Sequence, residues 1–250
     1  MGSKILENAP ADGYTLLHVT SSTHAIFPNV VRKSPFDPVK DFVGVILGMN
    51  APSFLFVHPS VLANSVSEFV AHAKSNPGAL NFGSPTAGGV GHLAAELFQL
   101  VAGIKLNHVP YKGSAPVLRA LLGGEIQIAF MGPGSSLAQV QAKKLKILAS
   151  GMEKRLSWLP DVPTFIEAGY PTMVTYNWQG IAAKTGTPSA IINKLNSEIA
   201  IVLARPSTAK IMQQQGYIAA TSTPAEFTRL IRDENEKWRK VAKETGALID

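Results

Sequence analysis

The sequence contains no cysteine, and this absence excludes several kinds of chemistry. Without thiols the chain forms no disulfide, holds no cysteine-ligated metal and carries out no thiol catalysis. The strings G-x-S-x-G and H-E-x-x-H and the P-loop are also missing. The six histidines are scattered, and the i, i+4 spacing of His92 and Glu96 is more typical of a capping or surface pair than of a metal site. We therefore expect no metal site.

Charged residues are scarce, at 16% of the 250-residue chain, and the net charge is only +6. Lys143, Lys144 and Lys146 form the one tight basic cluster. The basic residues near the C-terminus alternate with acidic ones, as on a solvated helix face. This pattern argues against nucleic-acid binding. Apolar residues make up 46%, with 21 glycines and 17 prolines, which predicts a folded core with many turns rather than disorder.

The sequence also lacks a long uninterrupted apolar run. Residues 42–67 carry no charge, but Asn50, Pro52, His58 and Pro59 interrupt them, so buried strands fit better than a membrane span. The sequence as given begins with no basic segment followed by an apolar one, and we expect no signal peptide in it.

Short apolar runs bounded by Gly, Pro and Ser predict buried strands. They are Tyr14–Thr20, Val43–Leu47, Phe54–Val57, Leu80–Gly83, Leu106–Val109, Ile126–Phe130 and Leu145–Ala149. Apolar residues at helical spacing, with capping boxes at Ser65–Glu68 and Thr223–Glu226, predict helices between and after several of these strands. The alternation predicts an α/β fold with mostly parallel sheets flanked by helices.

The predicted C-terminal helices need a sheet to cover, and the two earliest strands are the candidates for it. We therefore predict two lobes. Residues 1–57 and 178–250 form the first, and residues 58–177 form the second, which is inserted into it.

Polar, glycine-rich turns follow several of the predicted strands. Ser84–His92, Pro110–Ser114 and Met131–Ser136 should open on one edge of the second lobe, and Thr20–His24 should face them from the first. Ligands of open α/β sheets bind where strands end and helices begin, because loop N–H groups and positive helix ends meet there. The turns predict a site for a small anion that needs no cofactor.

An α/β enzyme and a non-binding remnant remain alternatives. Residues 89–94 match the dinucleotide pattern G-x-G-x-x-A, which would suit a nicotinamide enzyme. However, Ser84–Gly88 separates the pattern from its strand, and the next strand runs into Pro110 rather than an acid. His24 and His92 are the only acid–base candidates near the turns.

Several strings of the chain occur in the order and spacing of one family. They are Asp12–Leu17, Leu80–Ser84 followed by His92 and Glu96, Val109–Gly113, Leu159–Thr164 and Gly186–Pro188. From Ala11 to Asp250 the chain resembles the periplasmic substrate-binding proteins of tripartite tricarboxylate transporters, the Bug or TctC family. The resemblance implies a two-lobed Venus-flytrap fold. It also implies a monomer that captures a small carboxylate in the periplasm and presents it to membrane permease subunits, without catalysis or a cofactor.

The four turns and the resemblance together give the predicted ligand-binding residues. Trp178 is added because it lies where the chain returns from the second lobe to the first. They are Thr20, Ser21, Ser22, His24, Ser84, Thr86, Gly88, His92, Tyr111, Lys112, Gly113, Ser114, Met131, Gly132 and Trp178.

Three departures from the family pattern stand out. Gly89 replaces a common Ser or Thr and so removes a hydroxyl. Met131 stands where amino-acid-binding members carry an Asp, which implies a ligand without an amino group, such as a di- or tricarboxylate or an aromatic acid. The signal peptide and first strand–helix unit of the family are expected ahead of the segment that matches Lys4–Ala9, and the sequence as given does not include them, so we expect an incomplete first lobe with an exposed sheet edge.

Overall fold

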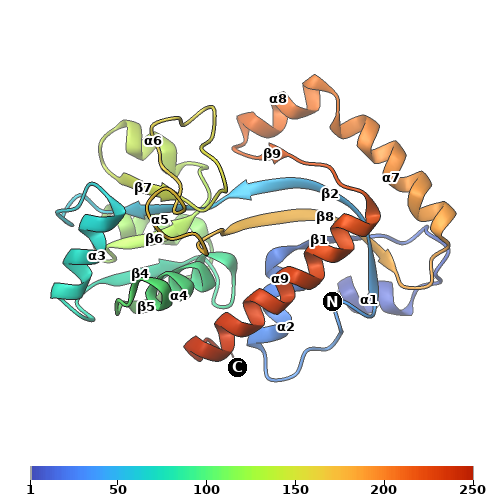
Figure 1. Ribbon diagram of the computed structural model, residues 1–250, viewed down its shortest axis with the longest axis horizontal. Coiled ribbons are helices and arrows are strands. Elements are labelled where there is room, and N and C mark those ends of the chain that lie inside the picture. The colour runs from blue at the N-terminus through green and yellow to red at the C-terminus, as the bar shows by residue number, and fades with distance from the viewer. Residues whose placement is uncertain (1, 250) are drawn as a thin grey trace. The chain divides into compact units, whose positions relative to one another are not determined.

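The computed structural model describes residues 2–249, which divide into two compact units (Figure 1). Unit 1 combines the chain up to Ala51 with the chain from Asn177 onward, and unit 2 is Pro52–Tyr176. From the sequence, the first boundary between the two lobes was predicted to follow Val57. In the structure the strand Phe54–Val57 lies in the sheet of unit 2, because it pairs there on both sides.

Unit 2 is built on a five-stranded sheet with the order β5-β4-β6-β3-β7. The strands are β3 (Phe54–Val57), β4 (Asn81–Ser84), β5 (Asn107–Pro110), β6 (Ile128–Met131) and β7 (Lys146–Ser150). Strand β4 runs parallel to both β5 and β6, whereas β3 runs antiparallel to β6 and β7. The parallel pairs follow from the strand–helix–strand connections that the sequence indicated.

The helices of unit 2 are α3 (Val66–Ser75), α4 (Val90–Ala102), α5 (Ser114–Leu122) and α6 (Ser136–Gln141). Helices α4 and α5 cover opposite faces of β4. The ring of Phe82 stacks on a side chain of α4, and a Cβ at Gly83 would meet Val117 of α5. The α4 side holds an aromatic core in which Phe98 contacts Phe69, Phe130 and Phe165.

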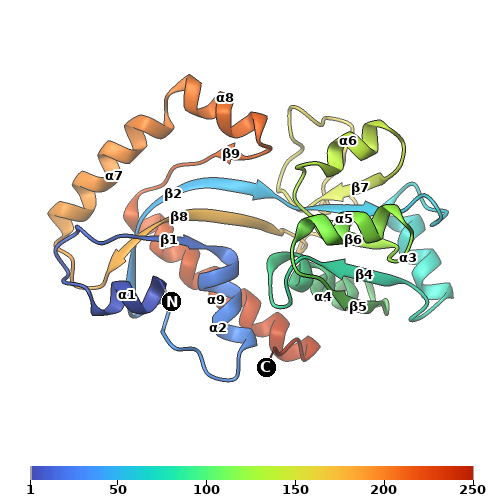
Figure 2. The ribbon, with the colours of Figure 1, turned by 180° about the vertical axis from the view of Figure 1, so that it is seen from behind.

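Unit 1 contains a four-stranded sheet with the order β1-β8-β2-β9 (Figure 2). Its strands are β1 (Leu17–Thr20), β2 (Phe42–Pro52), β8 (Tyr176–Lys184) and β9 (Ile218–Ala219). Its helical segments are α1 (Gly2–Asn8), the π-helical turn η1 (Ser21–Ile26), α2 (Phe27–Val30), α7 (Ser189–Leu203), α8 (Pro206–Gln214) and α9 (Pro224–Thr245).

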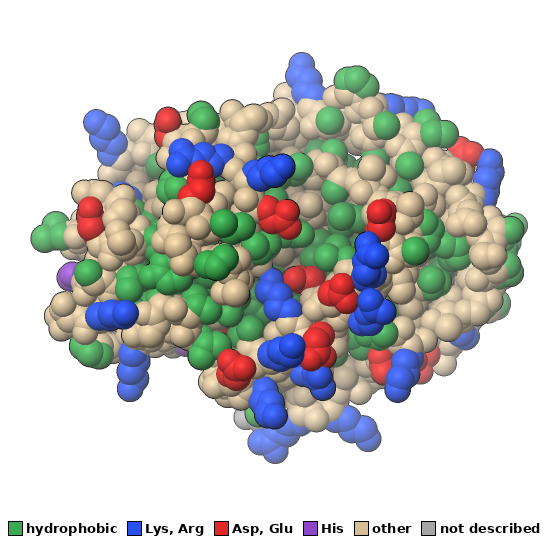
Figure 3. All heavy atoms as spheres, viewed as in Figure 1, with side chains coloured by type: hydrophobic (Ala, Val, Ile, Leu, Met, Phe, Trp, Pro, Cys, Tyr) green, Lys and Arg blue, Asp and Glu red, His purple; other side chains and the backbone are tan. Residues whose placement is uncertain are grey.

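The two long C-terminal helices sandwich this sheet. Phe227 of α9 lies where a Cβ on Gly44 or Gly180 would be, so α9 approaches that face closely. Ile192 of α7 packs with Val45 and Ala183 in a separate apolar cluster. The exposed side of α9 carries Lys and Arg side chains mixed with Asp and Glu (Figure 3), including the ion pairs Lys237–Glu234 and Arg239–Glu236.

The α/β architecture with helix-flanked sheets is confirmed, but the sheets are mixed rather than mostly parallel. Strand β1 pairs antiparallel with β8, and β2 pairs antiparallel with β9. These strands are far apart in sequence or joined without a single crossover helix, so the rule that makes neighbours parallel does not apply to them. No helix within residues 2–249 is long and apolar enough to cross a membrane.

Candidate functional site

The turns after β4, β5 and β6 share one edge of the unit 2 sheet. In the register of the sheet, Ser84 of β4 pairs with Pro110 of β5, and Gly83 of β4 pairs with Ala129 of β6. The three parallel strands therefore end side by side. This is the arrangement that the sequence predicted for Ser84–His92, Pro110–Ser114 and Met131–Ser136. Strand β3 runs the other way, and its first residue, Phe54, is level with Met131 at the same edge.

The first two turns are bonded to each other beyond the ends of their strands. The Tyr111 amide donates to the Ser84 carbonyl at 3.0 Å, and the Gly113 amide donates to the Pro85 carbonyl at 2.7 Å. Gly113 has a φ of +105°, a backbone conformation that residues other than glycine rarely adopt. The residue therefore lets the second turn bend back onto the first.

Helices α4 and α5 begin at this edge with their N-terminal amides uncapped. Their N-cap residues are Gly89 and Gly113, and neither helix has a side-chain capping hydrogen bond. The first amides of a helix lack intrahelical acceptors and carry its partial positive charge. Helix α3, in contrast, is capped by Ser65. The open ends of α4 and α5 are suited to an anion.

The charges around this edge favour the same kind of ligand. Neither α4 nor α5 has an acidic residue in its first turn, and Lys112 is exposed in the turn that precedes α5. The Tyr111 ring lies over Gly83 on the α5 side of the sheet, where burial, with a smaller contribution from Glu125, raises the pKa of its hydroxyl. Thr86 and Ser114 are exposed in the same turns.

A histidine pair lies beneath the first turn. The rings of His92 on α4 and His108 on β5 stack with centroids 3.9 Å apart. His108 Nε2 is 2.7 Å from Ser84 Oγ, and the Gly88 amide donates to His92 Nδ1 at 3.0 Å. On the other side of His92, Nε2 is 3.6 Å from Glu96 Oε1.

The surroundings of His108 keep its ring neutral. Burial, followed by the nearby His92, lowers the pKa of His108 from 6.5 to about 4, although Glu96 acts in the opposite direction. Ser84 itself is fully buried. In this structure the Ser84 hydroxyl and the Gly88 amide therefore hold the turn together, and neither is a free donor for a ligand.

Comparisons with known proteins assign the chain to one family. Residues 1–247 match the family model described as tripartite tricarboxylate transporter family receptor. The chain belongs to this receptor family. The protein BugT of Bordetella pertussis is 33% identical over 250 residues, which are 100% of this chain and 77% of BugT.

Solved structures agree with the assignment. A protein described as a periplasmic transporter superposes with a TM-score of 0.84 at 36% identity, over 99% of this chain and 83% of that one. The structure "R. palustris Rpa4515 with adipate" gives a TM-score of 0.84 at 34% identity, over 98% and 82% of the two chains. The predicted resemblance is thus confirmed. The receptor's relatives are substrate-binding proteins, which does not favour a nicotinamide enzyme. The G-x-G pattern has a packing explanation instead, because a Cβ on Gly91 would lie 2.5 Å from the Phe130 carbonyl oxygen.

The predicted turn of unit 1 is arranged mainly by internal contacts. Thr20 caps η1 through the Thr23 amide, and Ser21 Oγ donates to Asn177 Oδ1 at 2.8 Å. Thr20 and Ser22 remain partly exposed. Their part in ligand binding stays a prediction.

His24 lies in the core rather than at the surface. It is 1% exposed, and its ring lies 5.1 Å from that of Phe36 and 5.2 Å from that of Phe42. Burial, followed by the nearby His18, lowers its pKa from 6.5 to about 4. The receptor therefore holds His24 neutral among aromatic rings, a position that a ligand does not reach in this structure.

Two further predicted residues of the receptor are also buried. Trp178 on β8 has no exposed surface and packs edge-to-face on Phe227, with ring centroids 5.6 Å apart. Met131, the last residue of β6, is 5% exposed. Gly132, which follows it, is exposed.

His108 is the residue that sequence reasoning missed. It was noted only as one of six scattered histidines, although it lies in the predicted strand Leu106–Val109. Because Phe82 and His108 are partners in a parallel pair, their side chains share the face that α4 covers. The sequence signal that could have identified His108 was a histidine on the strand face that packs against a helix carrying a second histidine, His92.

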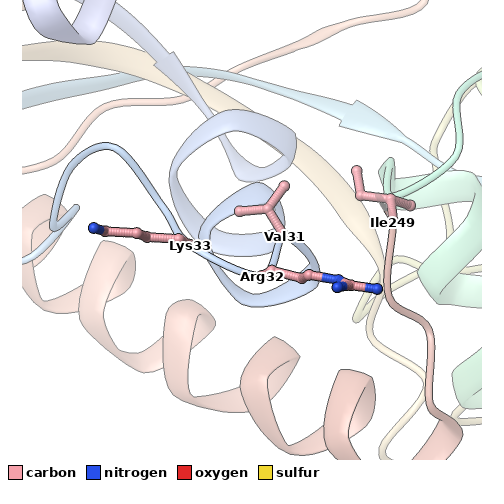
Figure 4. A pocket seen from close by; sticks show the side chains of 4 residues that line it. All are labelled: Val31, Arg32, Lys33 and Ile249. Atoms are coloured by element: carbon pink, nitrogen blue, oxygen red, sulfur yellow. The ribbon is translucent and has the colours of Figure 1, made fainter.

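Two further observations concern metal ions and a surface depression of unit 1. The described residues contain no group of three or more His, Asp or Glu side chains that could hold a metal ion. A depression on unit 1 is lined by Val31, Arg32, Lys33 and Ile249 (Figure 4). Arg32 extends beneath Ile249 whereas Lys33 points away, and none of the predicted site residues lines this depression.

Proposed function

We propose that this receptor binds a small carboxylate in the periplasm and presents it to the permease subunits of its transporter as a monomer, without catalysis. The observation that carries the proposal is the pair of uncapped helix N-termini at one edge of the unit 2 sheet. Their N-caps, Gly89 and Gly113, leave backbone amides of the helices open, and Lys112 is exposed in the turn that precedes α5. The predicted residues Thr86 and Ser114 are also exposed and supply further donors.

The interactions available here are strong enough for useful affinity without a metal. A helix N-terminus stabilises a nearby anion by about 0.3–1 kcal/mol, and by up to about 2 kcal/mol when partly buried. Each hydrogen bond to a charged group adds about 1.5–3 kcal/mol. A few such bonds offset the cost of ordering the ligand and give about −8 kcal/mol, which corresponds to micromolar affinity.

The ligand class follows from the absence of a carboxylate side chain at position 131. The buried Met131 places a thioether, not a carboxylate, at the end of β6, so this position offers no partner for a ligand ammonium. The binding of adipate by the R. palustris relative points in the same direction. We therefore infer a di- or tricarboxylate or an aromatic acid rather than an amino acid.

Isothermal titration of the wild-type chain with adipate, malate, citrate, benzoate and glutamate tests the ligand class. One of the acids without an amino group should bind more tightly than glutamate. A clear preference for glutamate would overturn the inference drawn from Met131.

Replacing Gly89 with aspartate tests the location of the site. The new carboxylate would cap α4 and occupy its free amides, so carboxylate binding should fall at least tenfold while thermal stability stays unchanged or rises. Gly89→Ala is the matched control, because it adds the same Cβ, 3.2 Å from the Thr86 carbonyl oxygen, but no group that can cap the helix. If Gly89→Asp bound the same acid as tightly as Gly89→Ala, the end of α4 would not be the site.

A further inference from the structure

The turn Ser84–Gly89 is held at both of its ends by the stacked histidines. At its start, Ser84 Oγ is 2.7 Å from His108 Nε2, and at its end the Gly88 amide donates to His92 Nδ1 at 3.0 Å. Between these two points the turn carries the exposed Thr86, and directly after it α4 begins with its uncapped amides. Together with the Tyr111 and Gly113 amides, which bond to the Ser84 and Pro85 carbonyls, the two rings therefore help to position the open donors.

The contact with Gly88 identifies the tautomer of the neutral His92 ring. An imidazole nitrogen that accepts from an amide carries no proton, so the proton of the neutral ring is on Nε2. Nε2 faces Glu96 Oε1 at 3.6 Å, and Gln99 Nε2 donates to Glu96 Oε2 at 3.1 Å, which holds that carboxylate in place. The chain of contacts thus runs from Gln99 through Glu96 and His92 to the Gly88 amide.

We propose that His92 is the positioning residue of the ligand-binding turn, and that protonation of its Nδ1 releases Gly88 and weakens binding as the pH falls. The inference rests on the proposed function, because the turn is taken as part of the carboxylate site. A protonated Nδ1 becomes a donor and repels the Gly88 N–H, so the turn loses the bond that ties Gly88 to α4.

The titratable groups around the ring are few. His108 faces it from β5, and Glu96 faces it from its own helix. Strands β4 and β6, which also pack against α4, contain no titratable side chain, and Arg119 of α5 is exposed on the opposite face of the sheet. Burial and the neighbouring His92 lower the pKa of His108 to about 4, so His108 stays neutral over most of the range in which histidines change charge.

The test compares His92→Asn with His92→Ala. Asparagine places its side-chain oxygen near the position of Nδ1 and can accept from Gly88, but it cannot take up a proton in this range. The dissociation constant is measured by isothermal titration at about pH 7.5 and about pH 5.5, which spans the histidine range. The probe is whichever of adipate, malate, citrate or benzoate binds the wild type most tightly.

For the wild type, the dissociation constant should rise about tenfold or more between the two pH values, the size of one hydrogen bond near a charge. His92→Asn should bind like the wild type at the higher pH and lose most of the pH dependence. His92→Ala should bind weakly at both. Protonation of the ligand itself affects all three proteins alike. Equal pH dependence in His92→Asn and the wild type would overturn the proposal.

A second measurement does not depend on any ligand. Nitrogen-15 NMR of the imidazoles should show the proton of His92 on Nε2 at the higher pH, and the Gly88 amide signal should shift in step with the titration of that ring. A proton on Nδ1, or a Gly88 signal indifferent to the titration, would refute the positioning role. If none of the acids binds, the proposed function fails, and this spectrum still decides whether His92 holds the turn.

Discussion

Replacing Gly91 with alanine should destabilise the receptor, although alanine forms helices better than glycine does. The added Cβ would lie 2.5 Å from the Phe130 carbonyl oxygen and 3.3 Å from Pro85 Cδ. A backbone oxygen cannot rotate away, so the first turn of α4 must move off β6. Overpacking of this kind costs about 1–3 kcal/mol. The helix propensity of alanine returns at most about 1 kcal/mol, so the net loss should be about 1–2 kcal/mol.

Thermal unfolding followed by circular dichroism measures this loss. In a chain of this length, 1 kcal/mol shifts Tm by about 2–4 °C, so Gly91→Ala should melt about 2–8 °C below the wild type. Gly123→Ala is the control. It lies at the end of α5 with a φ of −79°, and its added Cβ would lie 3.4 Å from the Arg119 carbonyl oxygen, an ordinary contact, so its Tm should hold or rise slightly. Titration should also show weaker carboxylate binding by Gly91→Ala, because the displaced turn carries the open amides. A Tm for Gly91→Ala at or above that of the wild type would refute this reasoning.

Other substitutions test the remaining parts of the structure. In the folded protein the pKa of His24 is lowered from 6.5 to about 4. As the pH falls from 6.5 toward 4, His24 is therefore protonated in the unfolded chain before it is protonated in the folded one. The free energy of unfolding should fall over this range by up to roughly 3 kcal/mol. His24→Gln should flatten that part of a plot of unfolding free energy against pH obtained by urea denaturation, and an unchanged slope would contradict its burial as a neutral ring. Lys112→Glu should weaken carboxylate binding, and the difference from the wild type should shrink in titrations at high salt. Ser65 Oγ accepts from the Glu68 amide at 3.1 Å. Ser65→Ala should therefore cost about 1 kcal/mol, or about 2–4 °C in Tm. Its ligand affinity should match the wild type, because α3 follows the end of β3 at the opposite edge of the sheet.

The strands of unit 2 were predictable because each is a short apolar run closed by a turn residue. All five runs from Phe54 to Ala149 appear as strands, shifted by one or two residues at some ends. Strand β8 was not predicted. It contains Asn177, Gln179 and Gly180 among its apolar residues, so it shows neither an apolar run nor a clean alternation. Its place is set by tertiary packing, since the Ile46 carbonyl and the Phe227 ring fill the space where a Cβ of Gly180 would be.

The clustering of the three turns of unit 2 was more predictable than the hydrogen bonding and burial of their side chains. Parallel strands end at a common edge, and this rule was enough to bring the turns after β4, β5 and β6 together. The sequence could not show that the Ser84 hydroxyl meets His108, because 24 residues separate them and only the register of β4 on β5 aligns them. Nor does local pattern distinguish a histidine that faces a ligand from one enclosed by Phe36 and Phe42, as His24 is.

The helices of this receptor differ in how the amides of their first turns are satisfied, and α6, α7 and α8 lack a side-chain cap as α4 and α5 do. Helices α3 and α9 begin with Ser65 and Thr223, whose hydroxyls accept from amides of the first turn. Helices α4 and α5 begin with glycine, which leaves those amides for another acceptor at a cost of only a few tenths of a kcal/mol per helix. A bound carboxylate would then accept hydrogen bonds from these amides in place of a side-chain cap. Ligand binding would thereby stabilise the starts of both helices. Because a ligand that binds only the native state raises its stability, carboxylate binding at these ends should raise the melting temperature of unit 2 directly. We therefore expect the anion at the glycine N-caps of α4 and α5 and not at the hydroxyl-capped starts of α3 and α9.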